Sequence, residues 1–461
     1  MSTESLALRV LLASFPGTTL PADWEVLLGE GLGGICLFGS NTADGPAAVA
    51  ELTTAIHAAN PGAVTAVDEE GGDVTRLYAG TASPVLGAAA LGAARDLALT
   101  RATGRAVGAD LAAAGIDLDL GPVADVNINA ANPVIGTRSF GVDPTLCAEQ
   151  VAAWVAGLQE TGLSACVKHF PGHGDTGQDS HLALPVVTVA RETLSSRELV
   201  PFAAAVRAGT AAVMTSHIVV TALDPERPAT MSPVVLGLLR DELGFDGVIV
   251  SDALDMHGAS AAVGIPEAAV LALAAGVDLL CIGPDKDSAL IREIQAAIVS
   301  AVEAGRLPLT RLEDAARRVA GLPRAVGGTA PVLDVAAQVA GAHAATAVEG
   351  DLPDLHGARV VTLHTPANIA IGEVPWGLPP DLVLTPQDSP ASGALIVQVR
   401  DAHRRPEVGA WLDRLEGPAV VVEWGWPGPA VGGLPRICPR GSSAPGIVAV
   451  SELLGRAGWD R

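Results

Sequence analysis

The stretch from residue 168 to residue 181 (KHFPGHGDTGQDSH) carries one lysine, three histidines and two aspartates. It follows the apolar run 163–167, so a buried strand is predicted to break here into a glycine- and proline-rich turn. Lys168 and Lys286 are the only lysines among 28 lysine and arginine residues, which suggests that a compact ammonium group is needed in this turn. The alternative is an exposed polar loop. We prefer a catalytic site at the end of a barrel strand to such a loop, because the ionisable side chains come directly after an apolar strand.

Asp179, His181 and Asp252 indicate what chemistry such a site would perform. Asp179 and His181 flank Ser180, and a carboxylate that accepts a hydrogen bond from one imidazole nitrogen raises the basicity of the other. Such a histidine can donate and accept a proton near neutral pH. Asp252 follows the run 247–251, and a carboxylate at the end of a buried strand is costly unless it is paired or used. A nucleophilic carboxylate with a protonatable partner is typical of retaining glycoside hydrolysis, although the usual partner is a second carboxylic acid.

Short apolar runs alternate with helix-like stretches between about residues 33 and 283. Strands are predicted at 34–38, 63–67, 117–120, 164–167, 211–215, 248–251 and 278–282, with helix-like segments such as 96–114, 147–160 and 267–275 between them. This alternation predicts parallel strands joined by crossover helices, and seven or eight such units predict a (β/α)8 barrel of the TIM type. Only seven strands are evident, so the eighth is expected to be short or irregular.

Polar clusters directly follow five of these runs. They are the segment 68–72 (DEEGG), Asp125 with Asn127, Lys168 with His169, Ser216 with His217, and Ser251 with Asp252. The ends of barrel strands converge on one face, where the active sites of such barrels are built. We therefore expect a single active site to which five strand ends contribute.

Composition excludes several classes of function. The formal net charge of −23 argues against binding to nucleic acid or to anionic membrane surfaces, and no run of about 18 apolar residues predicts a membrane span. The five cysteines are scattered and form no CxxC pair, so neither a structural zinc site nor a disulfide framework is indicated. The first residues lack the basic segment of a secretion signal, and the protein is expected to be cytoplasmic.

The barrel pattern ends with the helix-like segment 309–322, and residues 323–331 (PRAVGGTAP) have the composition of a linker. The predicted domains are a (β/α)8 catalytic barrel over residues 1–325 and a smaller C-terminal α/β domain over residues 335–461. Within the second domain, the segment 400–405 (RDAHRR) could reach the mouth of the barrel, but a solvated loop at a strand end is the preferred interpretation.

With these motifs in this order, the chain resembles the bacterial β-N-acetylglucosaminidases of glycoside hydrolase family 3. The resemblance covers about residues 6–322 and rests on DEEGG at 68–72 with Arg76, KHFPGHG at 168–174, DSH at 179–181 and SD at 251–252, supported by GGICLFG at 33–39 and GTRSFG at 136–141. The Asp-Ser-His ending distinguishes this branch from the β-glucosidases of the family. The C-terminal domain is a departure, because the shortest members consist of one domain.

The resemblance implies a retaining exo-β-N-acetylglucosaminidase without a cofactor, in which Asp252 is the nucleophile and His181, oriented by Asp179, is the acid/base. It implies that sugar hydroxyls are held by Asp68, Arg76, Arg138, Lys168 and His169, with Met214 and His217 lining the site. It also implies that the loop 175–181 closes over the bound sugar. The substrate would be a saccharide containing N-acetylglucosamine, either a muropeptide of cell-wall recycling or a chitooligosaccharide.

Three alternatives remain open at the level of sequence. A neutral histidine acid/base does not repel phosphate, so phosphate could replace water as the acceptor and make the protein a phosphorylase. His169, His173 and His181 with Asp175 could be the ligands of a metal-dependent barrel hydrolase, although their spacing matches neither H-x-H nor HExxH. A binding protein that has lost catalysis is the third alternative, and it is disfavoured because both presumed catalytic residues are present.

Overall fold

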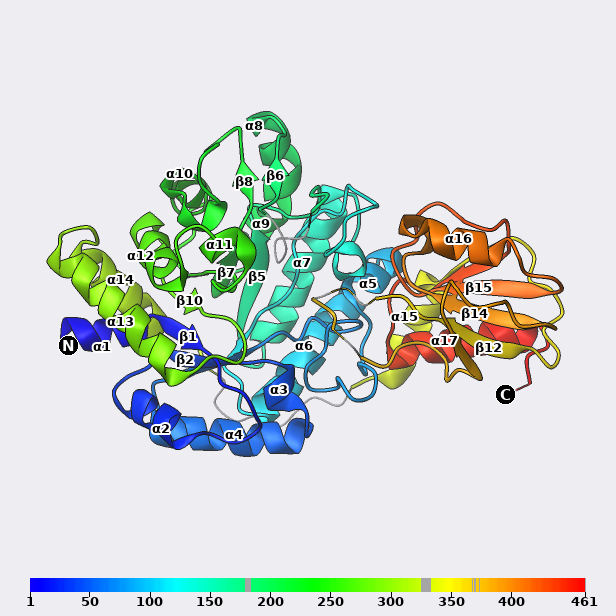
Figure 1. The fold of residues 1–461 in the computed structure, drawn as a ribbon, viewed down its shortest axis with the longest axis horizontal. Coiled ribbons are helices and arrows are strands. Elements are labelled where there is room, and N and C mark those ends of the chain that lie inside the picture. The colour runs from blue at the N-terminus through cyan, green and yellow to red at the C-terminus, as the bar shows by residue number, and fades with distance from the viewer. Residues whose placement is uncertain (179–183, 325–332, 367, 369, 373, 461) are drawn as a thin grey trace.

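The protein is described by a computed structural model that covers the chain except residues 179–183, 325–332, 367, 369, 373 and 461. It has two lobes, a barrel and a smaller C-terminal domain beside it (Figure 1). No helix in the described part of the chain is long and apolar enough to cross a membrane.

Eight parallel strands form the barrel. Their order is β10-β1-β2-β3-β4-β5-β7-β9, and a parallel bridge between Val250 and Leu279 joins the two ends of this order. The strands are β1 (Leu11–Ala13), β2 (Gly34–Leu37), β3 (Val64–Val67), β4 (Leu118–Asp119), β5 (Ser164–Phe170), β7 (Ala212–Thr215), β9 (Val248–Val250) and β10 (Leu280–Cys281). The predicted barrel is confirmed, and the strand that the sequence did not reveal is the three-residue β1, which lies between β10 and β2.

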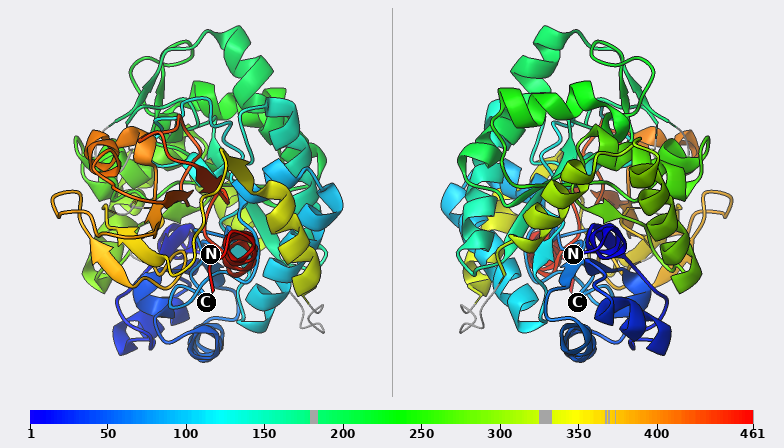
Figure 2. Two further views of the ribbon diagram at one scale, coloured as in Figure 1. Left: turned by 90° about the vertical axis from the view of Figure 1, so that its right-hand side faces the viewer. Right: turned by 90° about the vertical axis from the view of Figure 1, so that its left-hand side faces the viewer.

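Helices surround the barrel strands, as two views from opposite sides show (Figure 2). The helices of this lobe are α1 (Thr3–Arg9), α2 (Ala22–Gly29), α3 (Gly39–Thr42), α4 (Pro46–Ala59), α5 (Ala88–Ala94), α6 (Leu97–Ala113), α7 (Pro144–Gln159), α8 (Arg191–Thr193), α9 (Leu199–Arg207), α10 (Pro233–Gly237), α11 (His257–Ser260), α12 (Ile265–Ala275), α13 (Ser288–Glu303) and α14 (Leu309–Ala320). The aspartates Asp96, Asp143 and Asp287 accept backbone hydrogen bonds at the N-termini of α6, α7 and α13, which is why these long helices begin where they do. A small parallel pair, β6 (Val186–Val187) and β8 (Val219–Val220), lies outside the barrel sheet.

Alternate residues of each strand face opposite sides of the barrel wall. Leu12, Cys36 and Cys166 belong to the apolar cluster inside the barrel, whereas their neighbours Ile35 and Val167 belong to the larger cluster beneath the helices. Both sides of every strand are therefore buried, which explains the nearly continuous apolar runs in the sequence. All five cysteines are buried and unpaired.

Strand β5 ends three residues later than the strand 164–167 that was predicted from its apolar run. Lys168 and His169 were expected in a turn after the strand, but they lie within it. The reason is that neighbouring segments supply backbone partners beyond Val167: the Lys168 N–H donates to Pro122 O (3.1 Å), and the Ser216 N–H donates to Phe170 O (2.9 Å). The strand therefore holds both ionisable side chains rigidly at the mouth of the barrel.

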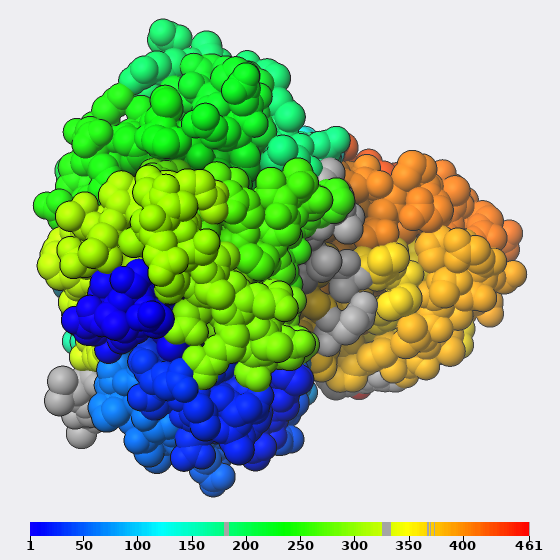
Figure 3. Space-filling view, turned by 60° about the vertical axis from the view of Figure 1, so that its left-hand side comes forward, coloured from blue at the N-terminus to red at the C-terminus, as the bar shows by residue number. Residues whose placement is uncertain are grey.

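The C-terminal domain contains a six-stranded sheet in the order β11-β16-β15-β14-β12-β13, parallel except for the β11–β16 pair. Its strands are β11 (Ala347–Glu349), β12 (Arg359–Leu363), β13 (Leu382–Leu384), β14 (Leu395–Val399), β15 (Ala419–Glu423) and β16 (Arg436–Cys438), and its helices are α15 (Val335–Ala345), α16 (Pro406–Leu412) and α17 (Ala444–Arg456). The domain is seated against one side of the barrel (Figure 3). Most of the predicted linker lies outside the described residues.

The segment 400–405 is not a solvated loop, so the preferred interpretation of the sequence was wrong here. The Arg400 guanidinium donates to Asp73 Oδ1 (2.8 Å), His403 Nε2 lies 2.8 Å from Ala130 O, and Arg404 donates to Asn132 O (3.1 Å). All three partners belong to the barrel. Charged side chains that look solvated in isolation are here paired across the junction between the two domains.

Candidate active site

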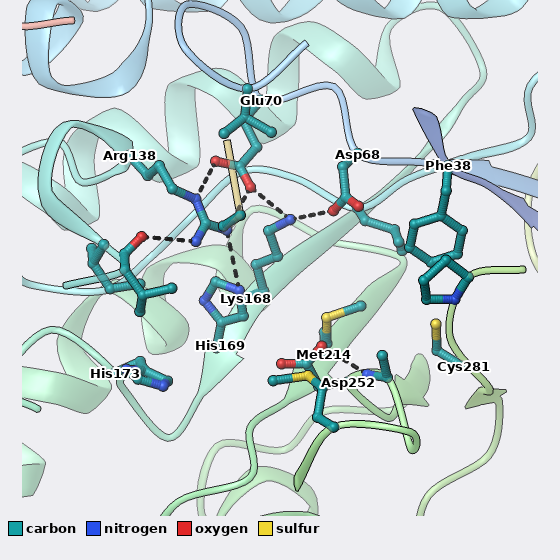
Figure 4. A pocket seen from close by; sticks show the side chains of 18 of the residues that line it. Phe38, Asp68, Glu70, Arg138, Lys168, His169, His173, Met214, Asp252 and Cys281 are labelled. Atoms are coloured by element: carbon teal, nitrogen blue, oxygen red, sulfur yellow. Dashed lines mark hydrogen bonds and ion pairs between the residues drawn. The ribbon is translucent and has the colours of Figure 1, made fainter. Parts of the chain in front are cut away.

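A cavity of about 410 Å³ opens at the carboxyl ends of the barrel strands. Its lining comprises Phe38, Asp68, Glu70, Val74, Arg76, Leu120, Val134, Ile135, Arg138, Lys168, His169, His173, Met214, Asp252, Ala253, Asp255, Met256, Cys281, Pro284 and Ala370. Figure 4 shows Asp68, Glu70 and Arg138 on one side of the cavity and Asp252 with Met214 on the opposite side. The predicted convergence of strand ends on one site is therefore present.

Lys168 is the centre of the charged side of the cavity. Its Nζ lies 2.6 Å from Asp68 Oδ1 and 2.7 Å from Glu70 Oε1, and only 2% of the side chain is exposed. Burial by itself would lower the pKa of Lys168, but the charges of Asp68 and Glu70 raise the pKa above its ordinary value. The ammonium group is therefore permanently charged and held in one position.

Glu70 links Lys168 to Arg138, and the sequence analysis did not include it among the site residues. The Arg138 guanidinium donates to both Glu70 oxygens (2.9 Å from Nε and 2.7 Å from Nη2). Burial would raise the pKa of Glu70, but Arg138 and Lys168 hold it well below its usual range. Glu70 stands in the DEEGG motif, so a signal was present, but the motif does not say which of its carboxylates faces Lys168.

His169 is oriented by a buried carboxylate. Its Nδ1 lies 2.7 Å from Asp125 Oδ2, and its Nε2 lies 3.4 Å from Arg138 Nη2. Asp125 also accepts the backbone N–H of His173 at 2.6 Å. Although burial would raise the pKa of Asp125, the neighbouring charge of His169 lowers it. Asp125 thus fixes both the imidazole of His169 and the turn that follows it.

His173 lines the cavity but is a poor candidate for the proton donor. Burial lowers the pKa of its imidazole to about 4, so His173 is neutral at neutral pH. Its Nδ1 lies 2.7 Å from Thr176 Oγ1. The other candidate in this turn, Asp175, pairs with Arg197 (2.5 Å) and is not among the residues that line the cavity.

Asp252 is the carboxylate on the opposite wall. It lies two residues after the end of β9, is partly exposed, and its Oδ1 accepts the Ala253 N–H at 2.8 Å. Asp255 also lines the cavity, but it forms an ion pair with Lys286 (2.7 Å). A ligand whose polar groups contacted the charged side of the cavity would therefore lie next to Asp252.

The remaining site residues from the sequence analysis have different surroundings. Met214 lines the cavity beside Asp252. Arg76 also lines it, and its guanidinium donates to the carbonyl groups of Ala370 (3.0 Å) and Ile371 (3.4 Å) in the C-terminal domain. His217 is fully buried behind the wall, with Nε2 3.0 Å from Ala253 O, and is not among the lining residues. It therefore supports the segment after Asp252 instead of facing the cavity.

Asp179 and His181, the predicted acid/base pair, lie outside the described residues, and their roles stay predictions. Among the described residues, no group of three or more histidine, cysteine, aspartate or glutamate side chains is arranged to hold a metal ion.

The buried position of Lys168 leads to a prediction. Replacing Lys168 by arginine is expected to lower kcat/KM by on the order of 10², because a planar guanidinium cannot reproduce two short ammonium contacts in a buried pocket. The matched control is Lys286→Arg, at the only other lysine of the chain, which is one-fifth exposed and does not line the cavity. Steady-state kinetics of both variants test this, and wild-type kinetics for Lys168→Arg would contradict it.

A barrel with a charged cavity at its strand ends defines a class of enzymes that act on polar small molecules. The model of the glycosyl hydrolase family 3 N-terminal domain matches residues 19–322. The chain therefore belongs to glycoside hydrolase family 3, and it is a glycosidase.

Individual members of the family show how far this similarity extends. The β-hexosaminidase of Alkalilimnicola ehrlichii is 37% identical over 340 residues, which is 68% of this chain and 97% of that protein. The structure of a family 3 β-N-acetylglucosaminidase from Paenibacillus sp. str. FPU-7 is 30% identical with a TM-score of 0.87, covering 99% of this chain and 97% of that one. NagZ from Neisseria gonorrhoeae, solved with N-trifluoroacetyl-D-glucosamine, is 32% identical with a TM-score of 0.61, covering 73% and 97%. The similarity to the Paenibacillus enzyme thus includes the C-terminal domain.

Proposed function

We propose that this protein is a retaining exo-β-N-acetylglucosaminidase that removes a terminal β-linked N-acetylglucosamine. The observation that carries the proposal is the placement of Asp252 on one wall of the cavity, across from the charged group formed by Asp68, Glu70, Arg138 and Lys168. The names of the relatives, β-hexosaminidase and β-N-acetylglucosaminidase, support the N-acetylated sugar.

The proposed reaction has two displacements. In the first, the Asp252 carboxylate attacks the anomeric carbon, the glycosidic bond breaks, and His181 gives a proton to the departing oxygen. In the second, His181 takes a proton from water as that water attacks the same carbon and releases Asp252. The Asp179 carboxylate would orient His181, and two inversions give net retention.

The charged wall would hold the sugar during both steps. Its hydroxyl groups would be bound by Asp68, Arg76, Arg138, Lys168 and His169, and Met214 would form part of the apolar wall beside Asp252. The ion pairs Lys168–Glu70 and Arg138–Glu70 hold these donors in fixed positions, which would limit their rearrangement when the sugar binds. The natural substrate would be a muropeptide or a chitooligosaccharide, and a role in cell-wall recycling stays a prediction of the sequence resemblance.

Product analysis tests this proposal and separates it from phosphorolysis. With an aryl β-N-acetylglucosaminide, the first sugar product detected by NMR should be the β-anomer of N-acetylglucosamine, with or without phosphate in the buffer. An α-anomer as the first product would contradict retention. Formation of N-acetylglucosamine 1-phosphate in phosphate buffer would instead identify a phosphorylase. This alternative is tested because a neutral histidine acid/base, unlike a carboxylate, does not repel phosphate.

The same assay tests the choice of sugar. The corresponding aryl β-glucoside should react at least 100-fold more slowly, because the proposed site is built to bind the 2-acetamido group and the glucoside lacks it. Equal rates on both substrates would contradict the N-acetylglucosaminidase assignment but not the glycosidase class.

A further inference from the structure

The segment after β3, which carries Asp68, Glu70 and Arg76, is held in place by the C-terminal domain at two points. The first point is Asp73, whose side chain is buried. Its Oδ1 accepts hydrogen bonds from the Arg400 guanidinium (2.8 Å) and the Ser442 N–H (2.9 Å), and its Oδ2 accepts one from Thr137 Oγ1 (2.7 Å). A residue three positions after Glu70 is thus fixed by two segments of the other domain.

The second point is the guanidinium of Arg76. It donates to Ala370 O and Ile371 O at 3.0 and 3.4 Å, while its backbone N–H donates to the buried Glu69 at 2.8 Å. Ala370 itself lines the cavity together with Arg76. The C-terminal domain therefore forms one part of the cavity wall and orients a cation that faces the cavity.

Asn368 fastens these carbonyl groups to the barrel. Its Nδ2 donates to Pro133 O (3.0 Å) and Val134 O (3.2 Å), and its Oδ1 accepts the Ala370 N–H (2.9 Å). Val134 O also accepts a hydrogen bond from Arg138 (3.1 Å). We call Asn368, Ala370 and Ile371 the clamp. It lies between the two arginines of the cavity and is connected to both.

An arginine side chain that is not held must lose its rotational freedom when a ligand binds, and that loss weakens binding. The two carbonyl groups order Arg76 before the ligand arrives. The same contacts place Ala370 against Val134 and Ile135, with which it packs at the rim of the cavity. Loss of the clamp would leave the catalytic Asp252 in place but would loosen the wall that binds the sugar.

We propose that the C-terminal domain completes the sugar-binding site, with the clamp as the element that positions Arg76 and closes one wall of the cavity. The proposal deepens the proposed function, since it takes the ligand of the cavity to be a sugar. Asn368 is a positioning residue in this scheme, because it acts through Ala370 and Arg76 and does not line the cavity.

Three variants of the full chain test the proposal. Asn368→Ala should raise KM about 10-fold with kcat within about two-fold, because it removes three hydrogen bonds that hold the clamp. Ala370→Trp should raise KM at least as much by filling the cavity next to Arg76. The matched control is Gln338→Ala, which removes contacts of α15 with Leu86 and Thr103 but touches no lining residue. It should keep the wild-type KM even if its thermal unfolding temperature falls.

The KM values of these variants decide whether the clamp positions the sugar-binding wall. A wild-type KM for Asn368→Ala overturns the proposal, as does an equal rise in KM for Gln338→Ala, which would mean that any loosening of the domain junction has the same effect. If Asn368→Ala does not fold, the KM of Ala370→Trp decides. The comparison uses whichever aryl glycoside the wild-type enzyme cleaves, so an error in the identity of the sugar does not change the test of the clamp.

Discussion

Replacing Asp252 by alanine is expected to lower kcat by on the order of 10³ or more, because it removes the carboxylate that would form the covalent intermediate. The nearest alternative along the chain, Asp255, is already paired with Lys286 at 2.7 Å. Initial rates on an activated aryl glycoside measure the effect. The fold of the variant is checked by its thermal unfolding, because truncation of a partly exposed side chain should leave the fold intact.

Covalent trapping makes this prediction specific. An activated 2-fluoro glycoside should label a peptide that contains Asp252, as detected by mass spectrometry. If Asp252→Ala kept a tenth or more of the wild-type activity, the assignment of Asp252 as the nucleophile would be wrong. Labelling of Asp255 would show that the nucleophile is Asp255, three residues later in the chain. Asp255→Asn serves as the comparison, with a smaller expected loss because its carboxylate is engaged by Lys286.

His181→Ala should show a loss of activity that depends on the leaving group. For a natural disaccharide, protonation of the departing oxygen contributes roughly 10²–10⁴-fold, so the loss should be of that size. An activated aryl glycoside leaves without a proton, and its glycosylation step should survive. Pre-steady-state rates on both substrates test this prediction, because they isolate glycosylation from the later hydrolysis step.

Asp179→Asn should give a milder form of the same pattern. Without the carboxylate, the imidazolium of His181 would lose its proton at lower pH, so the alkaline limb of the pH–rate profile should move to lower pH. Equal losses on both substrate types in His181→Ala would mean that His181 binds the sugar and does not transfer a proton.

In that case the structure narrows the search for another acid. Burial lowers the pKa of His173 to about 4, so at neutral pH it is not the imidazolium that a general acid would have to be. Asp175 is engaged by Arg197 and does not line the cavity. Neither residue, although both belong to the same motif, would be a straightforward replacement for His181.

Local features of the sequence were enough to predict the barrel. Each apolar run and each helical segment is a property of neighbouring residues, and parallel strands joined by helices bring their carboxyl ends to one face. Asp68, Lys168 and Asp252 could therefore be assigned to one site before any distance was known. Strand β1 escaped prediction because three apolar residues directly after a helix carry no periodic signal of their own.

Other features depended on contacts that no local pattern encodes. Glu70 joins Lys168 to Arg138 because the segment after β3, strand β5 and the turn Gly136–Arg138 meet at the mouth of the barrel. Arg76 and Ala370 are 294 residues apart in the chain, and their contact depends on how the second domain packs. The same packing turns the charged segment 400–405 from an apparent solvent-exposed loop into part of the domain junction. The sequence by itself predicted which side chains would carry the chemistry, because residue type and strand position are local. Only the tertiary structure decided which charges neutralise one another and which domain closes the cavity, because burial and pairing arise when distant segments pack together.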